Sequence, residues 1–194
     1  MSELSLNEVE SLALKVARGA GFSWGLAEDV GRGARALARD GLPWAEALIA
    51  LAHGAEDWVV PSSFLFEPAP GIALAGPLCP VRIAARVLDD SSILNRGPLR
   101  ITNVAVPLWI EALLAASMTG REFRVDWLGG PLAPIAEATI APLAASRPAV
   151  PPLRRARADA RMLATLGAIA ARVYVPASEG SRVRGAGGGT VDDD

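Results

Sequence analysis

The first fifty residues constrain the fold most, because three stretches of helical hydrophobic periodicity follow one another with very short turns between them. The opening Ser5-Leu-Asn-Glu8 has the pattern of a capping box, in which a Ser and a Glu three residues later satisfy free N–H groups at a helix start. An apolar repeat at helical spacing follows it as far as Ala20. The sequence therefore predicts a helix that begins just after Ser5.

Two more helices are expected directly after the first. Ser23 suits the cap of a second helix, and Gly41 suits its end. Pro43 suits the first turn of a third helix that runs through Ala52. Because turns this short join antiparallel neighbours, residues 1–56 are predicted to form an N-terminal antiparallel helical cluster.

The composition changes after Asp57, where proline and glycine become frequent between short apolar runs. Three of these runs, 58–60, 63–66 and 72–75, are predicted to be short strands. The pattern of residues 81–88 leaves helix and strand open, although Pro80 favours entry into a helix.

The remaining body alternates strand and helix patterns. We expect strands at 99–104 and 123–127, with 138–143 as a partner of the second, and helices at 107–117 and 158–173. The fold class is therefore predicted to be α+β: an N-terminal antiparallel helical cluster with a mixed region of short strands and two long helices. The body is expected over 57–173, with a tail over 174–194 packed on it as part of one folding unit.

Composition excludes several classes of protein. The net charge is −2, and no basic stripe carries interleaved aromatic residues, so no nucleic-acid partner is expected. Cys79 is the single cysteine, which rules out an internal disulfide and a cysteine-based zinc site. The apolar stretch 104–116 is too short to span a bilayer, and the N-terminus lacks the apolar region of a signal peptide. We expect a cytoplasmic bacterial protein with no membrane partner.

The C-terminal tail combines residue types that could form a site. Gly185, Gly187 and Gly189 can adopt positive φ, so that successive N–H groups point into one concavity that suits an anion. Arg182 and Arg184 precede them and supply planar donors for a carboxylate or phosphate. These residues are the predicted substrate-binding part of the tail.

Acidic residues close the tail. Asp192 and Asp194 could pair with the arginines, hold a divalent ion, or act as acid and base. Ser178 and Glu179 suit either a capped turn or a place in the same site, with Glu179 as a further acid–base residue. The alternative is a flexible terminus, since the motif lacks the Lys and Ser/Thr of a phosphate-binding loop.

Two residues outside the tail complete the predicted site. His53 is the single histidine and could serve in acid–base catalysis, or it could simply complement the dipole at a helix end. Trp24 could form a wall of the pocket or belong to the core. Cys79 lies among apolar residues, which should raise its pKa rather than activate it.

Two stretches at the ends of the chain carry a family resemblance. They are the opening SLNEVESLALKVARGAGFSWGLAEDVGRGARAL and the closing YVPASEGSRVRGAGGGTVDDD. Both resemble the signature ends of a bacterial family catalogued as domain of unknown function 3726. The resemblance implies that the tail is a signature, although the chain departs from the family's GAGAG and Asp-Asn-Asp endings at Gly188 and Asp193. The family name implies no activity, cofactor or metal.

These observations leave two functions open. The first is an enzyme, an isomerase, lyase or hydrolase, that acts on a small anionic metabolite with the tail forming the site. The second is a non-catalytic subunit or binding partner of a metabolic enzyme, joined through apolar helices such as 107–117. A mean hydropathy of +0.30 favours a homo-oligomer or a partner subunit under either hypothesis.

Overall fold

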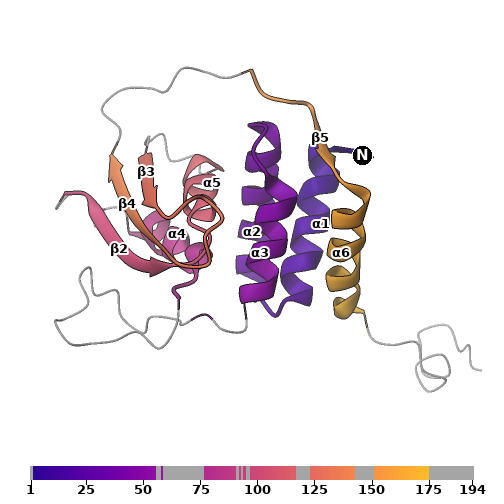
Figure 1. The fold of residues 1–194 in the computed structure, drawn as a ribbon, viewed down its shortest axis with the longest axis horizontal. Helices are drawn as coiled ribbons and strands as arrows, with labels where there is room; N and C mark the ends of the chain where they lie inside the picture. Colours follow the sequence, from indigo (N-terminus) through magenta and orange to yellow (C-terminus); the bar gives the residue numbers. More distant parts are fainter. Residues whose placement is uncertain are drawn as a thin grey trace, which may run out of the picture.

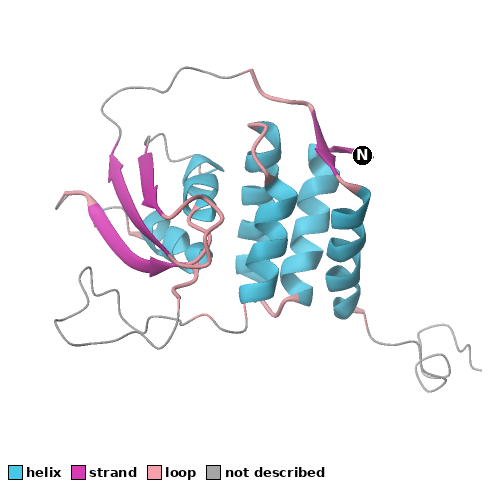
Figure 2. Ribbon diagram, viewed as in Figure 1, coloured by secondary structure: helices cyan, strands magenta, loops and turns pink. Residues whose placement is uncertain are grey.

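The computed structural model describes residues 2–55, 58, 77–90, 92, 94, 97–116, 123–142 and 151–174. Within these residues the fold is α+β, as expected, with a layer of helices beside a small sheet (Figures 1 and 2). The predicted strands at 58–60, 63–66 and 72–75 lie outside the described residues except for Trp58. The tail also lies outside them after Tyr174.

The N-terminal helical cluster consists of α1 (Leu6–Gly19), α2 (Trp24–Arg39) and α3 (Trp44–Gly54). The predicted capping box is confirmed: the Ser5 hydroxyl accepts from the N–H of Glu8 at 3.2 Å, and the Glu8 carboxylate accepts from the N–H of Ser5 at 2.7 Å. Ser23 occupies the cap position of α2, but its side chain makes no capping hydrogen bond. The stability of α2 therefore depends mainly on its buried apolar face.

The last helix, α6 (Ala160–Ala170), continues as the short 3₁₀ helix η2 (Ala171–Val173) and packs against α1 and α3. It joins the helical layer, with α1 beside it in Figure 1. The two backbones approach so closely that a Cβ added at Gly19 would lie 2.0 Å from the carbonyl oxygen of Ile169. A short antiparallel pair, β1 (Ser2–Ser5) with β5 (Arg155–Ala158), holds the same two chain regions together.

The second sheet contains β2 (Leu99–Val104), β3 (Phe123–Leu128) and β4 (Ala136–Pro142) in the order β2-β4-β3. Both pairings are antiparallel, so β4 is the central strand. The predicted strands at 99–104 and 123–127 are confirmed, and 138–143 is indeed the partner of the second, in a register that sets Val125 opposite Ile140.

Two helices pack with this sheet, α4 (Pro80–Asp89) and α5 (Leu108–Ala116). The segment that the sequence left open between helix and strand is thus a helix, with Pro80 in its first turn. The expected pair of long helices is not confirmed, because α4, α5 and α6 have 10, 9 and 11 residues.

The buried apolar residues form two clusters, and α5 belongs to both. Trp109 and Leu113 pack in the cluster formed mainly by α1, α2 and α3, whereas Ile110 and Leu114 pack against α4 and the sheet. A helix that is apolar on nearly all sides lies between two packed layers, and α5 is such a helix. No helix among the described residues is long and apolar enough to cross a membrane.

Candidate functional site

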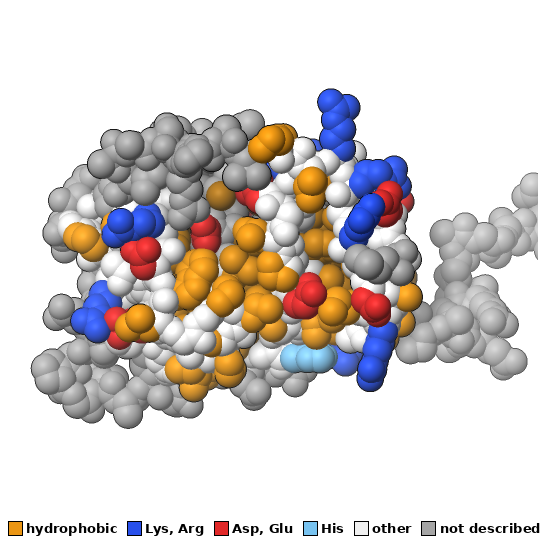
Figure 3. Space-filling model, turned by 45° about the horizontal axis from the view of Figure 1, so that its top comes forward, with side chains coloured by type: hydrophobic (Ala, Val, Ile, Leu, Met, Phe, Trp, Pro, Cys, Tyr) orange, Lys and Arg blue, Asp and Glu red, His pale blue; other side chains and the backbone are white. Residues whose placement is uncertain are grey.

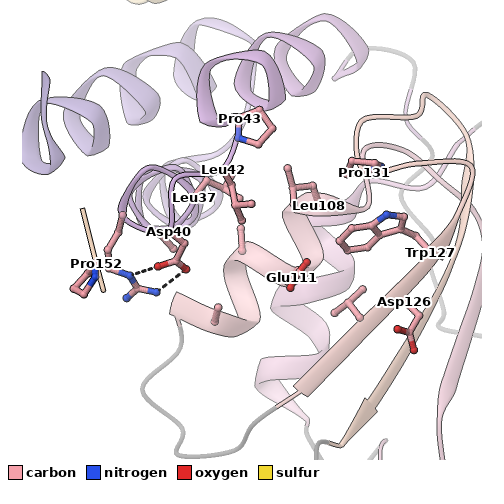
Figure 4. A pocket seen from close by; sticks show the side chains of 15 residues that line it. Leu37, Asp40, Leu42, Pro43, Leu108, Glu111, Asp126, Trp127, Pro131 and Pro152 are labelled. Carbon is pink, nitrogen blue, oxygen red and sulfur yellow. Dashed lines mark hydrogen bonds and ion pairs between the residues drawn. The ribbon is translucent and has the colours of Figure 1, made fainter. Parts of the chain in front are cut away.

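A cleft of about 1020 Å³ opens between the helical layer and the sheet. The C-terminal end of α2 forms one wall, α5 forms the floor, and β3 forms the opposite wall (Figure 4). The apolar part of its lining includes Leu37, Leu42, Pro43, Leu108, Val125 and Trp127. Ligand pockets in proteins are usually concave and mostly apolar, with a few polar groups that orient the ligand, so this cleft is the candidate binding site.

The α2 wall is shaped by the turn that ends this helix. Gly41 has φ +72°, and the N–H of Leu42 returns to the carbonyl of Leu37 at 2.9 Å. This is the glycine-containing closure that lets a helix end in a left-handed residue, and it places Leu42 on the cleft. The N–H of Leu153 donates to the carbonyl of Arg39 at 2.7 Å, so the segment that contains Pro152 is attached to the same wall.

The floor is positioned by the turn between β3 and β4. The N–H of Val106 donates to the carbonyl of Ala133 at 2.8 Å, and that of Leu108 donates to the carbonyl of Pro131 at 3.1 Å. Val106 has φ +42°, an unfavourable conformation for a β-branched residue. These contacts fix the start of α5 against the β3–β4 turn. They therefore set the direction in which α5 runs along the floor of the cleft.

The charged groups of the lining are mostly acidic. Among the described lining residues Arg39 is basic, whereas Asp40, Glu111 and Asp126 are acidic, which gives a formal charge of 1 − 3 = −2. Arg39 donates two hydrogen bonds to Asp40, at 2.7 and 3.0 Å, and this pairing raises the pKa of Arg39. Asp126 forms an ion pair of 2.7 Å with Arg124 on the same strand. Glu111 extends from α5 into the cleft in Figure 4.

The surface view shows the same arrangement over a wider area. Apolar side chains gather across the middle of the face in Figure 3, between the sheet and the helices, with carboxylate groups in and beside them. Leu42 is 38% exposed. An apolar surface with carboxylates at its margin suits a ligand with an apolar body and a positively charged or hydrogen-bond-donating group.

Most of the residues predicted from the sequence to form a site lie outside the described residues. They are the predicted catalytic Glu179, Asp192 and Asp194 and the predicted binding residues Ser178, Arg182, Arg184, Gly185, Gly187 and Gly189. Their roles stay predictions.

His53 and Trp24 are described, and neither lines the cleft. His53 is exposed in the last turn of α3. Trp24 is 61% exposed at the start of α2, and the guanidinium carbon of Arg18 lies 4.6 Å from the centre of its ring. This distance is typical of a cation–π contact. Trp24 is therefore a surface partner of Arg18 and not a core residue.

Cys79 is buried at the start of α4, and burial raises the pKa of its thiol, as the sequence predicted. A raised pKa keeps the thiol protonated and unreactive. Among the described residues no group of three or more His, Cys, Asp or Glu side chains could hold a metal ion.

Sequence reasoning missed the cleft, although it placed several of its residues in the correct elements. Glu111 is the single charged residue of the otherwise apolar α5, and this was the available signal. Asp126 and Trp127 were assigned to the strand at 123–127 without any reason to regard them as a site. Leu42 and Pro152 gave no signal, because they come together only when the chain folds.

One protein family, described as Protein of unknown function (DUF3726), matches residues 4–64. The resemblance drawn from the opening of the chain is confirmed over this range, which covers α1, α2 and α3. The tail lies outside the matched range. No curated protein and no solved structure matches the chain.

Proposed function

Since residues 4–64 match the DUF3726 family model and the description of that family states no activity, we propose a function from the cleft alone. The protein is a binding protein, and the cleft between α2, α5 and β3 holds its ligand. The ligand has an apolar body and carries positive charge. This proposal agrees with the non-catalytic alternative drawn from the sequence, a subunit or binding partner of a metabolic enzyme.

The observation that carries the proposal is the composition of the cleft lining. Leu108 of α5 and Val125 of β3 are 2% and 4% exposed, so the floor and one wall belong to the packed interior. Leu108 is held by the hydrogen bond from its N–H to the carbonyl of Pro131, and Val125 is held by the pairing of β3 with β4 opposite Ile140. A rigid apolar surface loses little conformational freedom when a ligand covers it, which favours binding.

The acidic groups of the cleft lining indicate which charge a ligand should carry. The described lining has three carboxylates and one guanidinium, and Arg124 pairs with Asp126 beside it, which leaves a local charge of 2 − 3 = −1. This excess of negative charge favours a cation over an anion. The anionic metabolite predicted from the sequence therefore needs a different site, such as the arginines of the tail. The two ligand classes can be separated by experiment.

The test is a thermal-shift screen of the full chain with arylalkylammonium and arylguanidinium compounds and with short peptides that combine apolar and basic residues. A ligand that binds only the native state raises the unfolding temperature. The blocking variant is Ala115→Trp, which fills the cleft from an exposed position on α5. The matched control is Ala168→Trp, at an alanine on α6 that is also exposed and does not line the cleft. We expect stabilisation of the wild type and of Ala168→Trp, and none of Ala115→Trp.

The catalytic hypothesis stays a second proposal. In it Arg182 and Arg184 hold a small anionic metabolite and Asp192 or Asp194 moves a proton. One observation in the described region favours an anion: Arg18, within the family match, has no acidic partner among the described residues. Deleting residues 185–194 should abolish stabilisation by phosphate or carboxylate compounds while binding in the cleft persists. A deletion without effect on either ligand class would argue against this hypothesis.

A further inference from the structure

The outer edge of β3 is a candidate surface for binding another chain. This strand pairs with β4 along six residues on one side, from Phe123 opposite Pro142 to Leu128 opposite Glu137. It is the end strand of the order β2-β4-β3, and no described segment pairs with its other side. An edge strand presents a row of backbone N–H and C=O groups that can form hydrogen bonds with another chain, so it is a template for strand pairing.

This edge borders the cleft. Val125, Asp126 and Trp127 of β3 line the cleft, and Leu37 and Leu42 of the helical layer form the opposite wall. Figure 4 shows Trp127 and the strand on one side of the space and α2 on the other. A neighbouring strand would lie about 4.8 Å from β3, which places it inside the cleft.

The lining of the cleft indicates which residue types the added strand would carry. Successive side chains of an extended segment point to opposite sides. Those that point to α5 meet the apolar Leu108 and Ala112, whereas others come near the carboxylates of Asp40, Glu111 and Asp126. Apolar residues that alternate with arginine or lysine satisfy both surroundings.

We propose that an extended segment of a partner protein, with alternating apolar and basic residues, adds to the outer edge of β3 within the cleft. This inference rests on the proposed binding function of the cleft and specifies its ligand. Main-chain hydrogen bonds to β3 supply affinity, and the alternating side chains supply specificity, as in other cases of strand addition.

The experiment uses a fluorescein-labelled peptide of alternating valine and arginine with the full-length chain, and fluorescence anisotropy as the readout. Two further peptides carry N-methyl groups on every second residue, one on the odd and one on the even positions. In an added strand only alternate residues direct their N–H groups to the neighbour. We expect one N-methylated peptide to bind like the parent and the other to lose at least about tenfold in affinity. A peptide with glutamate in place of arginine should lose a similar factor.

The outcomes separate the two proposals. If both N-methylated peptides bind as well as the parent while Ala115→Trp abolishes binding, the cleft binds the peptide but strand addition is wrong. If the parent peptide fails to bind while an organic cation still binds the wild type and not Ala115→Trp, the occupant is a small molecule and the inference is overturned. If peptide binding is unchanged in Ala115→Trp, the cleft is not the site, and both proposals fail.

Discussion

The indole N–H of Trp109 donates a hydrogen bond of 3.0 Å to the backbone carbonyl of Ala47. Trp109 is fully buried in α5, and Ala47 lies in α3, so this bond joins the floor of the cleft to the helical layer. The rest of the indole ring packs against α2, where Gly33 leaves space for it. The position of the cleft floor relative to the helical layer therefore depends on this contact.

Replacing Trp109 by phenylalanine removes the indole donor and leaves a gap where the larger ring packed. The carbonyl of Ala47 lies within α3 and keeps its intrahelical hydrogen bond, so the loss comes from one hydrogen bond and from packing. Trp109→Phe should lower the free energy of unfolding by about 1–3 kcal/mol in urea titration. Trp24→Phe is the control, because Trp24 is largely exposed, and its effect should stay within about 0.5 kcal/mol. Equal effects of the two variants would contradict the assigned role.

Gly33 allows α2 to approach α5. A Cβ at this position would lie 2.9 Å from Cζ3 of Trp109 and 3.1 Å from Cδ2 of Leu113. Overpacking of a core usually costs about 1–3 kcal/mol, and we expect Gly33→Ala to destabilise the protein in that range.

Gly25 on the same helix gives the matched control for Gly33. Nothing lies within 4 Å of an added Cβ there, so Gly25→Ala should leave stability unchanged or raise it by up to about 1 kcal/mol through helix propensity. Thermal and urea unfolding measure both variants. A stabilising Gly33→Ala would mean that α2 and α5 are further apart than the structure has them.

The capping box makes the stability of α1 depend on pH. Hydrogen bonds from the N–H and the hydroxyl of Ser5 lower the pKa of Glu8 from its ordinary value of 4.5. A carboxyl whose pKa is lower in the folded state stabilises that state above the unfolded pKa, and this contribution is lost as the pH falls through the folded pKa. Glu8→Gln should therefore reduce stability at neutral pH and have a smaller effect below pH 4.5. Unfolding temperatures at a series of pH values measure the difference.

A control for Glu8 is Glu137, whose pKa is lowered by a hydrogen bond and by charge attraction from Arg100. This pair lies on the surface of the sheet, where ion pairs contribute little and salt screens them. Added salt should diminish the effect of Glu137→Gln more than that of Glu8→Gln, since Glu8 accepts a backbone N–H within a helix cap. Equal salt sensitivity of the two variants would contradict this reasoning.

Cys79 provides a test of the packing around the start of α4. Burial raises the pKa of its thiol, so little thiolate forms at mildly alkaline pH. The folded protein should react slowly with a disulfide reagent such as Ellman's, and the unfolded protein should react at the rate of a free cysteine. The chain has no other cysteine, so the signal reports this site alone. Fast reaction of the folded protein would show that Cys79 is accessible.

Local sequence patterns predicted much of the fold. The capping box, the helical periodicities before residue 52 and the alternation at Phe123, Val125 and Trp127 are short-range features, and the structure confirms each of them. The pairing of β1 with β5 was not predicted, because its two strands are four residues long and more than 140 residues apart. Such strands form only when packing brings them together.

The candidate site was the part that sequence could not locate. Glu111 is the single charge within the apolar helix α5, but nothing along the chain relates it to Asp40, Asp126 or Leu42. The tail attracted attention because its glycines, arginines and aspartates are adjacent in sequence. Its residues after Tyr174 lie outside the described part of the chain, so its role stays a prediction.

The sequence by itself determined the fold class, the three N-terminal helices, the strand at 123–127 and the resemblance of the opening of the chain to DUF3726, which matches residues 4–64. These features depend on residues that are close in the chain, whose spacing sets which face of a helix or strand is apolar. Only the tertiary structure decided that α6 joins the N-terminal helices and that α5 belongs to both apolar clusters. It also decided that the edge of β3 borders a cleft. Those outcomes depend on contacts between residues that are distant in the chain. Such contacts include the close approach of backbones and side chains at Gly19 and Gly33 and the hydrogen bond from Trp109 to Ala47.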